Sequence, residues 1–161
     1  MPQALKQVFT LRIDLLPPLE FGTTFNGDRR FIPITGGVIE DSDGRVVGEI
    51  LNGGGDWSVV RSDGVIHLHA KYSIKLEDGT LVNITNEGFG RAATAPVSDI
   101  FSDDQAAAPR ADQGGAWYIK TWPRFEVAPG KHDWLNKTCF VGDLRPPEKP
   151  NHVVVDVYEL L

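Results

Sequence analysis

Apolar and polar residues alternate along most of the chain. The clearest case is "GVIHLHAKYSIKL", residues 64–76, in which histidine, lysine and serine alternate with isoleucine, leucine, alanine and tyrosine. Successive side chains of a β-strand point to opposite faces, so this spacing predicts a strand with one polar and one apolar face. The segment "VFTLRIDLL" at 8–16 has the same period, and no segment stands out with the period of an amphipathic helix.

Turn signals separate the predicted strands. Asn-Gly-Asp at 26–28 and Asp-Gly at 43–44 and 78–79 each stand between two alternating segments. This arrangement is typical of β-hairpins. Further alternating segments follow later in the chain, at 116–127, 133–144 and 151–161. We therefore predict an all-β protein with about nine to ten strands.

These strands suit an antiparallel barrel or a sandwich. We favour a single antiparallel β-barrel over residues 1–161, because hairpins without helices to cover their edges tend to close on themselves. A small barrel can also enclose one small ligand. The segment near residues 92–115 is rich in Ala, Asp, Ser and Pro, and we predict a long loop there.

Composition narrows the classes of protein. The formal net charge is -6 and no basic patch is visible, which argues against a nucleic-acid partner. The N-terminal segment lacks the pattern of a signal peptide and no stretch is long enough to span a membrane, so we expect a cytoplasmic protein without a membrane partner. The single cysteine, Cys139, excludes an internal disulfide; its neighbours predict a buried thiol in a strand.

The glycine run "GGGDW", residues 53–57, has strand-like segments on both sides. A phosphate-binding loop would lead into a helix, so that interpretation fails. Two alternatives remain for the residues that follow. Asp56 and Trp57 can be parts of a tight turn, or Asp56 can be a general acid or base beside a ligand with Trp57 as an aromatic wall.

His67, His69 and Lys71 share one face of the strand at 64–76. If that face points inward, His69 with Lys71 beside it suits proton transfer, because histidine titrates near neutral pH. Two histidines could also ligate zinc, with Glu87 on the neighbouring predicted strand as a third ligand, but two histidines are a weak signal and we predict no metal site. The alternative is an ordinary polar outer face.

A mixed aromatic and charged face follows the predicted long loop. By period two it contains Tyr118, Lys120, Trp122, Arg124 and Glu126. Such a face could hold a planar, polar substrate; the alternative is an exposed face whose charges pair with neighbouring strands. Trp134 suits the core, with a ligand contact as the alternative.

Several short motifs occur in a definite order along the chain. They are "ITGG" (34–37), "GGGDW" (53–57), "RSDG" (61–64), "HAKYSIKLEDG" (69–79), "NEG" (86–88), "PRFE" (123–126) and "WLN" with "FVGD" (134–143). Over almost its whole length the chain resembles the DUF3237 (UPF0311) family. The resemblance implies an up-and-down antiparallel β-barrel and, from the few relatives with proposed roles, a cofactor-free cyclase of aromatic or polyketide substrates. His69 departs from the pattern, since that position is usually acidic, and the loop at 92–115 is longer than the family leads us to expect.

Two functions fit the sequence. The first is a cofactor-independent cyclase, isomerase or lyase that acts by acid–base chemistry on a small aromatic or polyketide-like metabolite. The second is a non-catalytic carrier of a small molecule. We expect no cofactor, and we expect a homodimer because edge strands are exposed. The catalytic residues of the first hypothesis are Asp56, His69, Lys71 and Arg124. Its substrate-binding residues are Trp57, Tyr72, Glu87, Tyr118, Trp122, Glu126 and Trp134.

Overall fold

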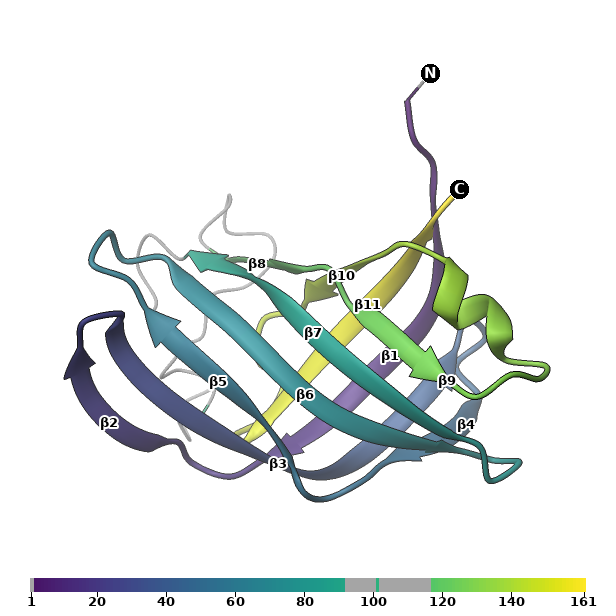
Figure 1. Ribbon diagram of the computed structural model, residues 1–161, viewed down its shortest axis with the longest axis horizontal. Helices are drawn as coiled ribbons and strands as arrows, with labels where there is room; N and C mark the ends of the chain where they lie inside the picture. Colours follow the sequence, from purple (N-terminus) through teal and green to yellow (C-terminus); the bar gives the residue numbers. More distant parts are fainter. Residues whose placement is uncertain (1, 92–100, 102–116) are drawn as a thin grey trace.

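The protein is an antiparallel β-barrel (Figure 1). The computed structural model describes residues 2–91, 101 and 117–161. Within them it has eleven strands and a short 3-10 helix. The elements are β1 (Leu5–Leu15), β2 (Leu19–Thr24), β3 (Gly27–Asp41), β4 (Val46–Ile50), β5 (Gly54–Val60), β6 (Ile66–Leu76), β7 (Leu81–Arg91), β8 (Tyr118–Thr121), β9 (Arg124–Val127), η3 (Asp133–Lys137), β10 (Phe140–Leu144) and β11 (His152–Leu160).

Eight strands form the closed ring of the barrel. Their order is β6, β5, β3, β1, β11, β10, β8 and β7, and the ring closes where β7 pairs with β6. The first and last strands of the chain are neighbours in this ring, with Leu11 opposite Val155. Figure 1 shows both termini at the same end of the molecule. The predicted antiparallel barrel is therefore confirmed, with eleven strands where the sequence indicated nine or ten.

The remaining strands make the two ends of the barrel different. The long strand β3 pairs with β5 along its first half and with β4 along its second half. In the same way β7 pairs first with β9 and then with β8. Next to β9 lies η3, where Asn136 both accepts a hydrogen bond from the Val127 N–H and donates one to its carbonyl, each at 2.9 Å. The side chain of Asn136 thus holds η3 against the free edge of β9.

The core follows the alternation seen in the sequence. On β6 the isoleucine, leucine, alanine and tyrosine side chains point inward, and the intervening polar side chains point outward. The predicted hairpin turns are also present, with Gly44 and Gly79 in left-handed conformations that suit glycine. Residues 92–100 and 102–115 of the predicted long loop lie outside the described part of the chain.

Cys139 is exposed, so the predicted buried thiol is wrong. The reason is the register of β10, which begins at Phe140. Phe140 takes the inward position and is 4% exposed, and the residue before it therefore faces out. In the described ranges, no helix has the length and apolar character needed to cross a membrane.

Candidate functional site

A cavity of about 60 Å³ lies inside the barrel, on the side of β5 and β8. Most of its wall is apolar, because alternate residues of each strand face inward. Phe101 also lines it. The main apolar wall residues are Ile13, Ile34, Leu68, Ile119, Leu144 and Val155.

Four polar side chains interrupt this apolar wall. They are Asp56, Tyr72, Asn86 and Thr121, all of them buried. The pairing of the strands brings two of them together, since Asp56 on β5 and Asn86 on β7 both pair with Ala70 on β6. The small alanine side chain between them leaves the space of the cavity open.

Three of these side chains have polar atoms without hydrogen-bond partners in the described part of the protein. The atoms are Tyr72 Oη, Asn86 Oδ1 and Thr121 Oγ1. Leaving a buried polar group unpaired costs about 1–3 kcal/mol. The cavity therefore offers a hydroxyl donor and two oxygen acceptors that a bound molecule can satisfy.

Burial raises the pKa of Asp56 to about 6. Its Oδ1 accepts a hydrogen bond of 2.8 Å from the backbone N–H of His69, which lowers the pKa and offsets part of this rise. Burial also raises the pKa of Tyr72, and the negative charge of Asp56 raises it further. At neutral pH the cavity thus contains a carboxylate able to take up a proton and a phenol that keeps its own.

The close packing of Thr121 depends on glycines in the two neighbouring strands. Gly88 on β7 and Gly142 on β10 are its cross-strand partners. A Cβ atom at Gly142 would lie 2.2 Å from Thr121 Oγ1, and one at Gly88 would lie 2.6 Å from Thr121 Cγ2. Only residues without a side chain leave room for Thr121 at this point of the wall.

The run "GGGDW" lies at the start of β5. Gly53 precedes the strand with a φ of 115°, and the next two glycines belong to the strand itself. A Cβ at Gly55 would lie 2.3 Å from the Phe31 ring, so the glycine lets that ring pack on the strand. Asp56 then points into the cavity, whereas Trp57 points outward, with its ring 4.4 Å from that of Phe31.

His69 and Lys71 lie on the outer face of β6 and are exposed. The structure does not bring them to the cavity. Of the two orientations considered for this strand, the outward one for its polar residues is observed. The reason is that the alternate residues, such as Leu68 and Ile74, bury their apolar side chains in the barrel.

The other predicted site residues also lie outside the cavity, except Tyr72. Arg124 and Glu87 approach each other on the outer surface, with 4.0 Å between Nη2 and Oε2. Glu87 also contacts His67 at 2.8 Å, and this hydrogen bond lowers the pKa of Glu87. No group of three potential metal ligands occurs in the part of the chain that the structure describes. The remaining outward-facing residues are Tyr118, Trp122 and Glu126. Trp134 lies on η3, against the Phe9 ring.

Asn86 and Thr121 are cavity residues that the sequence did not single out. Their signal is a polar residue within an apolar stripe. Asn86 shares the inward face of β7 with Val82 and Ile84, and Thr121 follows Ile119 by two residues on β8. The sequence shows these apolar stripes, but it does not show that they face the inside of the barrel.

Comparison with known proteins gives relatives over nearly the whole chain. A UPF0311 protein of Bradyrhizobium diazoefficiens is 31% identical over 156 residues, which cover 97% of this chain and 95% of the relative. A crystal structure from Rhodopseudomonas palustris, described as a conserved protein of unknown function, has a TM-score of 0.82 and 28% identity, covering 100% of this chain and 99% of that one.

Two further solved structures share the fold. A β-barrel-like protein of Acinetobacter baumannii has a TM-score of 0.78 and 32% identity, and the likeness covers 100% of this chain and 98% of that one. A protein of Penicillium herquei, described as an enzyme, has a TM-score of 0.65 and 20% identity, covering 100% and 96%; this is a likeness of fold. The model of the family described as "Protein of unknown function (DUF3237)" matches residues 3–160, and the chain belongs to that family.

Proposed function

We propose that the protein is a cofactor-independent acid–base enzyme that acts on a small aromatic or polyketide-like metabolite in the barrel cavity. The observation that carries this proposal is the buried carboxyl of Asp56, whose pKa is about 6, beside polar atoms that lack partners among the described residues. A carboxyl with this pKa exchanges protons readily near neutral pH. A perturbed carboxyl in an apolar cavity is a common mark of a catalytic site.

The roles follow from the chemistry of each group. The Asp56 carboxylate takes a proton from one substrate atom and, once protonated, returns it to another. Tyr72 keeps its proton and donates a hydrogen bond to the substrate oxygen on which negative charge develops. Asn86 and Thr121 accept hydrogen bonds from substrate hydroxyls. No net proton, electron or co-reactant is consumed, which suits a cyclase, isomerase or lyase.

Substrate binding in this proposal includes a movement of Phe101. The cavity of about 60 Å³ is smaller than the cavity of about 150 Å³ that accepts benzene. Phe101 lines the cavity and is only half-buried, so its displacement enlarges the space at least cost in core packing. We expect Phe101→Ala to tighten the binding of any substrate found.

The test begins with a thermal-shift screen of phenolic and polyketide metabolites, followed by assays of turnover on each hit. Asp56→Asn keeps the acceptor for the His69 N–H but cannot take up a proton. We expect it to lower kcat by about 10²-fold or more, with binding retained. In the parent protein kcat/KM should rise with pH through about 6.

Tyr72→Phe and His69→Ala complete the set. We expect the loss of the Tyr72 hydroxyl to lower kcat by about tenfold or more, because an oxyanion donor is removed. The His69 side chain lies on the outer face of β6, the strand of Tyr72, so His69→Ala should leave turnover unchanged. Unchanged turnover in Asp56→Asn would overturn the proposed role. Ligands that bind without being converted would instead support the carrier.

A further inference from the structure

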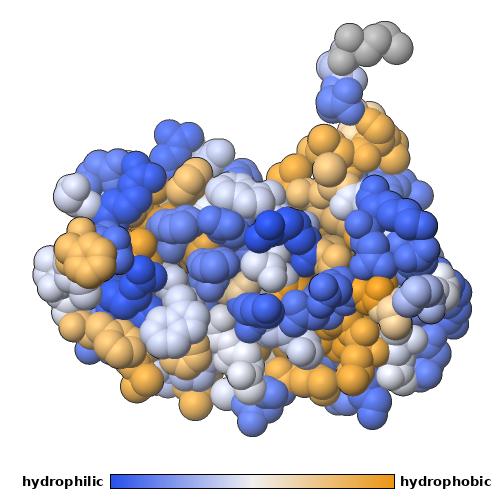
Figure 2. All heavy atoms as spheres, viewed as in Figure 1, coloured by the Kyte–Doolittle hydropathy of each residue, from blue (hydrophilic) through white to orange (hydrophobic). Residues whose placement is uncertain are grey.

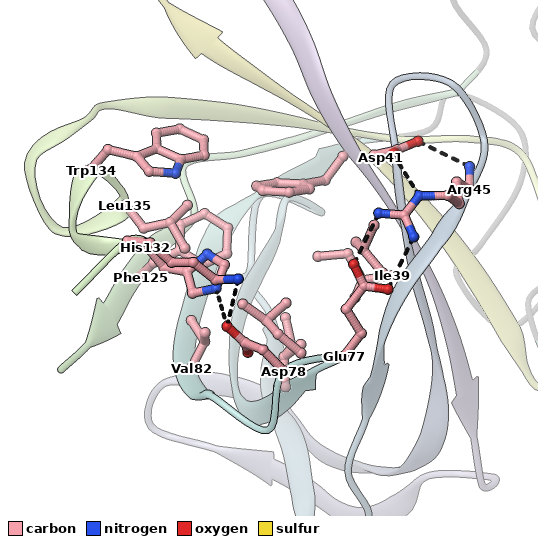
Figure 3. A pocket seen from close by; sticks show the side chains of 15 residues that line it. Ile39, Asp41, Arg45, Glu77, Asp78, Val82, Phe125, His132, Trp134 and Leu135 are labelled. Carbon is pink, nitrogen blue, oxygen red and sulfur yellow. Dashed lines mark hydrogen bonds and ion pairs between the residues drawn. The ribbon is translucent and has the colours of Figure 1, made fainter. Parts of the chain in front are cut away.

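A second pocket, of about 250 Å³, opens at the opposite end of the barrel (Figure 3). It lies between β4, the β6–β7 turn, β9 and η3. In Figure 2 apolar side chains show between charged ones over this part of the molecule. The pocket's apolar lining includes Ile39, Ile74, Val82, Phe125 and Leu135, all of them buried.

This pocket is separate from the cavity that contains Asp56, and the two share no lining residue. Between them lies a packed layer that includes Leu11, Ile84 and Val157, each 0% exposed. On β7, for example, Ile84 stands between Val82, which lines the pocket, and Asn86, which lines the cavity. A molecule in the pocket therefore makes no contact with Asp56.

One side of the pocket is aromatic. Trp134 on η3 stacks against Phe9 on β1, with 6.1 Å between ring centroids. Trp134 is 39% exposed, so part of its ring is free to contact a ligand. Asn136 fixes η3 to the backbone of Val127, which holds the Trp134 ring at the opening. The pocket thus offers a flat apolar surface before any ligand arrives.

Ion pairs surround the opening, and they leave no basic group of the lining without a carboxylate partner. Arg45 donates two hydrogen bonds to Glu77, of 2.9 and 3.0 Å. Across the opening, Asp78 Oδ2 lies 2.9 Å from His132 Nε2 and 3.1 Å from Lys131 Nζ. Figure 3 shows the two groups on different sides of the space. An anionic ligand would bring its charge close to the carboxylates of Asp41, Glu77 and Asp78, which costs binding energy.

We propose that this pocket is a second binding site, specific for an uncharged aromatic molecule of one or two rings. Its volume exceeds the roughly 150 Å³ that accepts benzene, its floor is apolar and each of its basic groups already has a carboxylate partner. Trp134 and Phe9 provide the ring contacts. This site does not depend on the function proposed for the Asp56 cavity.

The experiment is a nuclear magnetic resonance titration with two matched probes, naphthol and naphthoate, at neutral pH. We expect naphthol to give saturable shifts of the Trp134 indole N–H and of the η3 backbone, with a Kd below about 1 mM. Naphthoate has the same rings but a negative charge, and we expect it to bind about tenfold more weakly. Trp134→Phe assigns the indole signal.

Variants separate the pocket from the cavity and test the charge argument. Val82→Phe fills the pocket and should abolish the η3 shifts. Trp134→Ala removes a partly exposed wall of the pocket, together with ring contacts to Phe9 and Phe140, and should weaken naphthol about tenfold. Glu77→Gln leaves Arg45 without its strongest carboxylate partner and should strengthen naphthoate alone. Asp56→Asn should leave the η3 shifts unchanged.

Three results would overturn the proposal. The first is the absence of shifts at Trp134 and η3, and the second is shifts confined to residues around Asp56. The third is equal affinity for the two probes. Each of these results is independent of whether the Asp56 cavity turns over any metabolite, so failure here is distinguishable from failure of the proposed enzyme.

Discussion

At the scale of single residues, the burial of Asp56 destabilises the charged form of its carboxyl. Asp56 is 8% exposed and lies in a mostly apolar wall. The charged form is therefore destabilised relative to the unfolded chain, where the carboxyl is in water. The difference between the ordinary pKa of 3.8 and about 6 corresponds to about 3 kcal/mol.

We predict that Asp56→Asn changes how the free energy of unfolding depends on pH. The folded protein holds the Asp56 proton up to about pH 6, so stability due to the neutral carboxyl is present below the unfolded pKa and lost as pH rises through about 6. The asparagine variant does not lose it. In urea unfolding, the free energy of unfolding of the variant should rise relative to that of the parent protein by up to about 3 kcal/mol between about pH 4 and 7.

Asp63→Asn is the control for this measurement. The hydrogen bond from Arg61 lowers the pKa of Asp63, so its ionised form stabilises the fold. That variant should fall behind the parent protein as the pH rises toward about 4 and then keep a constant difference, so it shows no gain on the parent protein between about pH 4 and 7. A constant difference between Asp56→Asn and the parent protein across this pH range would contradict the assigned state of Asp56.

At the scale of elements, β7, β8 and β10 pack closely because two glycines face one threonine. A Cβ atom added at either glycine would clash, but with a different kind of atom in each case. At Gly142 the atom that a Cβ would strike is the side-chain oxygen of Thr121, at 2.2 Å. At Gly88 the nearest atom is the backbone oxygen of Lys120, also at 2.2 Å. Only the first contact can be relieved by a second substitution.

We predict that Gly142→Ala destabilises the protein by about 1–3 kcal/mol through overpacking. Adding Thr121→Ala should restore about 1 kcal/mol or more, because it removes the clashing oxygen. In a double-mutant cycle measured by urea unfolding, the pair should therefore show a favourable coupling.

Gly88→Ala is the matched comparison, since Thr121→Ala cannot relieve a backbone clash. The cycle of these two substitutions should show no such rescue. An equal rescue at both glycines would mean that the Thr121 side chain, and not the backbone oxygen of Lys120, sets the spacing of these strands at Gly88.

The sequence predicted the strands and hairpins well because the period of two and the Asp-Gly turns are local signals. It could not decide which face of a strand lies inside the barrel. For β6 both faces were reasonable: the polar face with His69 and Lys71 suits a binding site, and the apolar face suits a core. Burial of the apolar face decides the outcome once the ring closes.

The sequence singled out Asp56 as a candidate site residue but not Asn86, for a related reason. Asp56 follows a distinctive glycine run, whereas Asn86 begins the motif "NEG", in which nothing marks it as a cavity residue. Its neighbourhood depends on the register of three strands, which places it beside Ala70 and near Asp56. Register is a property of the closed barrel and leaves no mark within any one strand.

At the scale of the whole molecule, the first and last strands of the chain, β1 and β11, pair side by side in the barrel wall. Asp156 on β11 joins this seam on the outer face. Its Oδ2 accepts a hydrogen bond of 2.7 Å from Arg145, and its Oδ1 accepts one of 2.9 Å from Thr10 on β1. The carboxylate therefore links β1, β11 and the segment after β10, and the bond to Asp156 raises the pKa of Arg145.

We predict that Asp156→Asn lowers the free energy of unfolding by about 1.5–3 kcal/mol, since charge-assisted hydrogen bonds are lost in a mostly buried position. Urea unfolding measures the loss. Glu159→Gln, on the same strand, removes an ion pair with the exposed Lys6 and should change stability by less than about 0.5 kcal/mol. Equal losses in the two variants would show that Asp156 has no special part in closing the barrel.

The packed layer of Leu11, Ile84 and Val157 has a kinetic consequence. The layer fills the interior of the barrel between its two ends, so a small molecule has no path along the barrel axis. If the proposed function of the Asp56 cavity is correct, its substrate and its product enter and leave without passing through the pocket beside Trp134. A ligand in that pocket would then leave the path of substrate and product open.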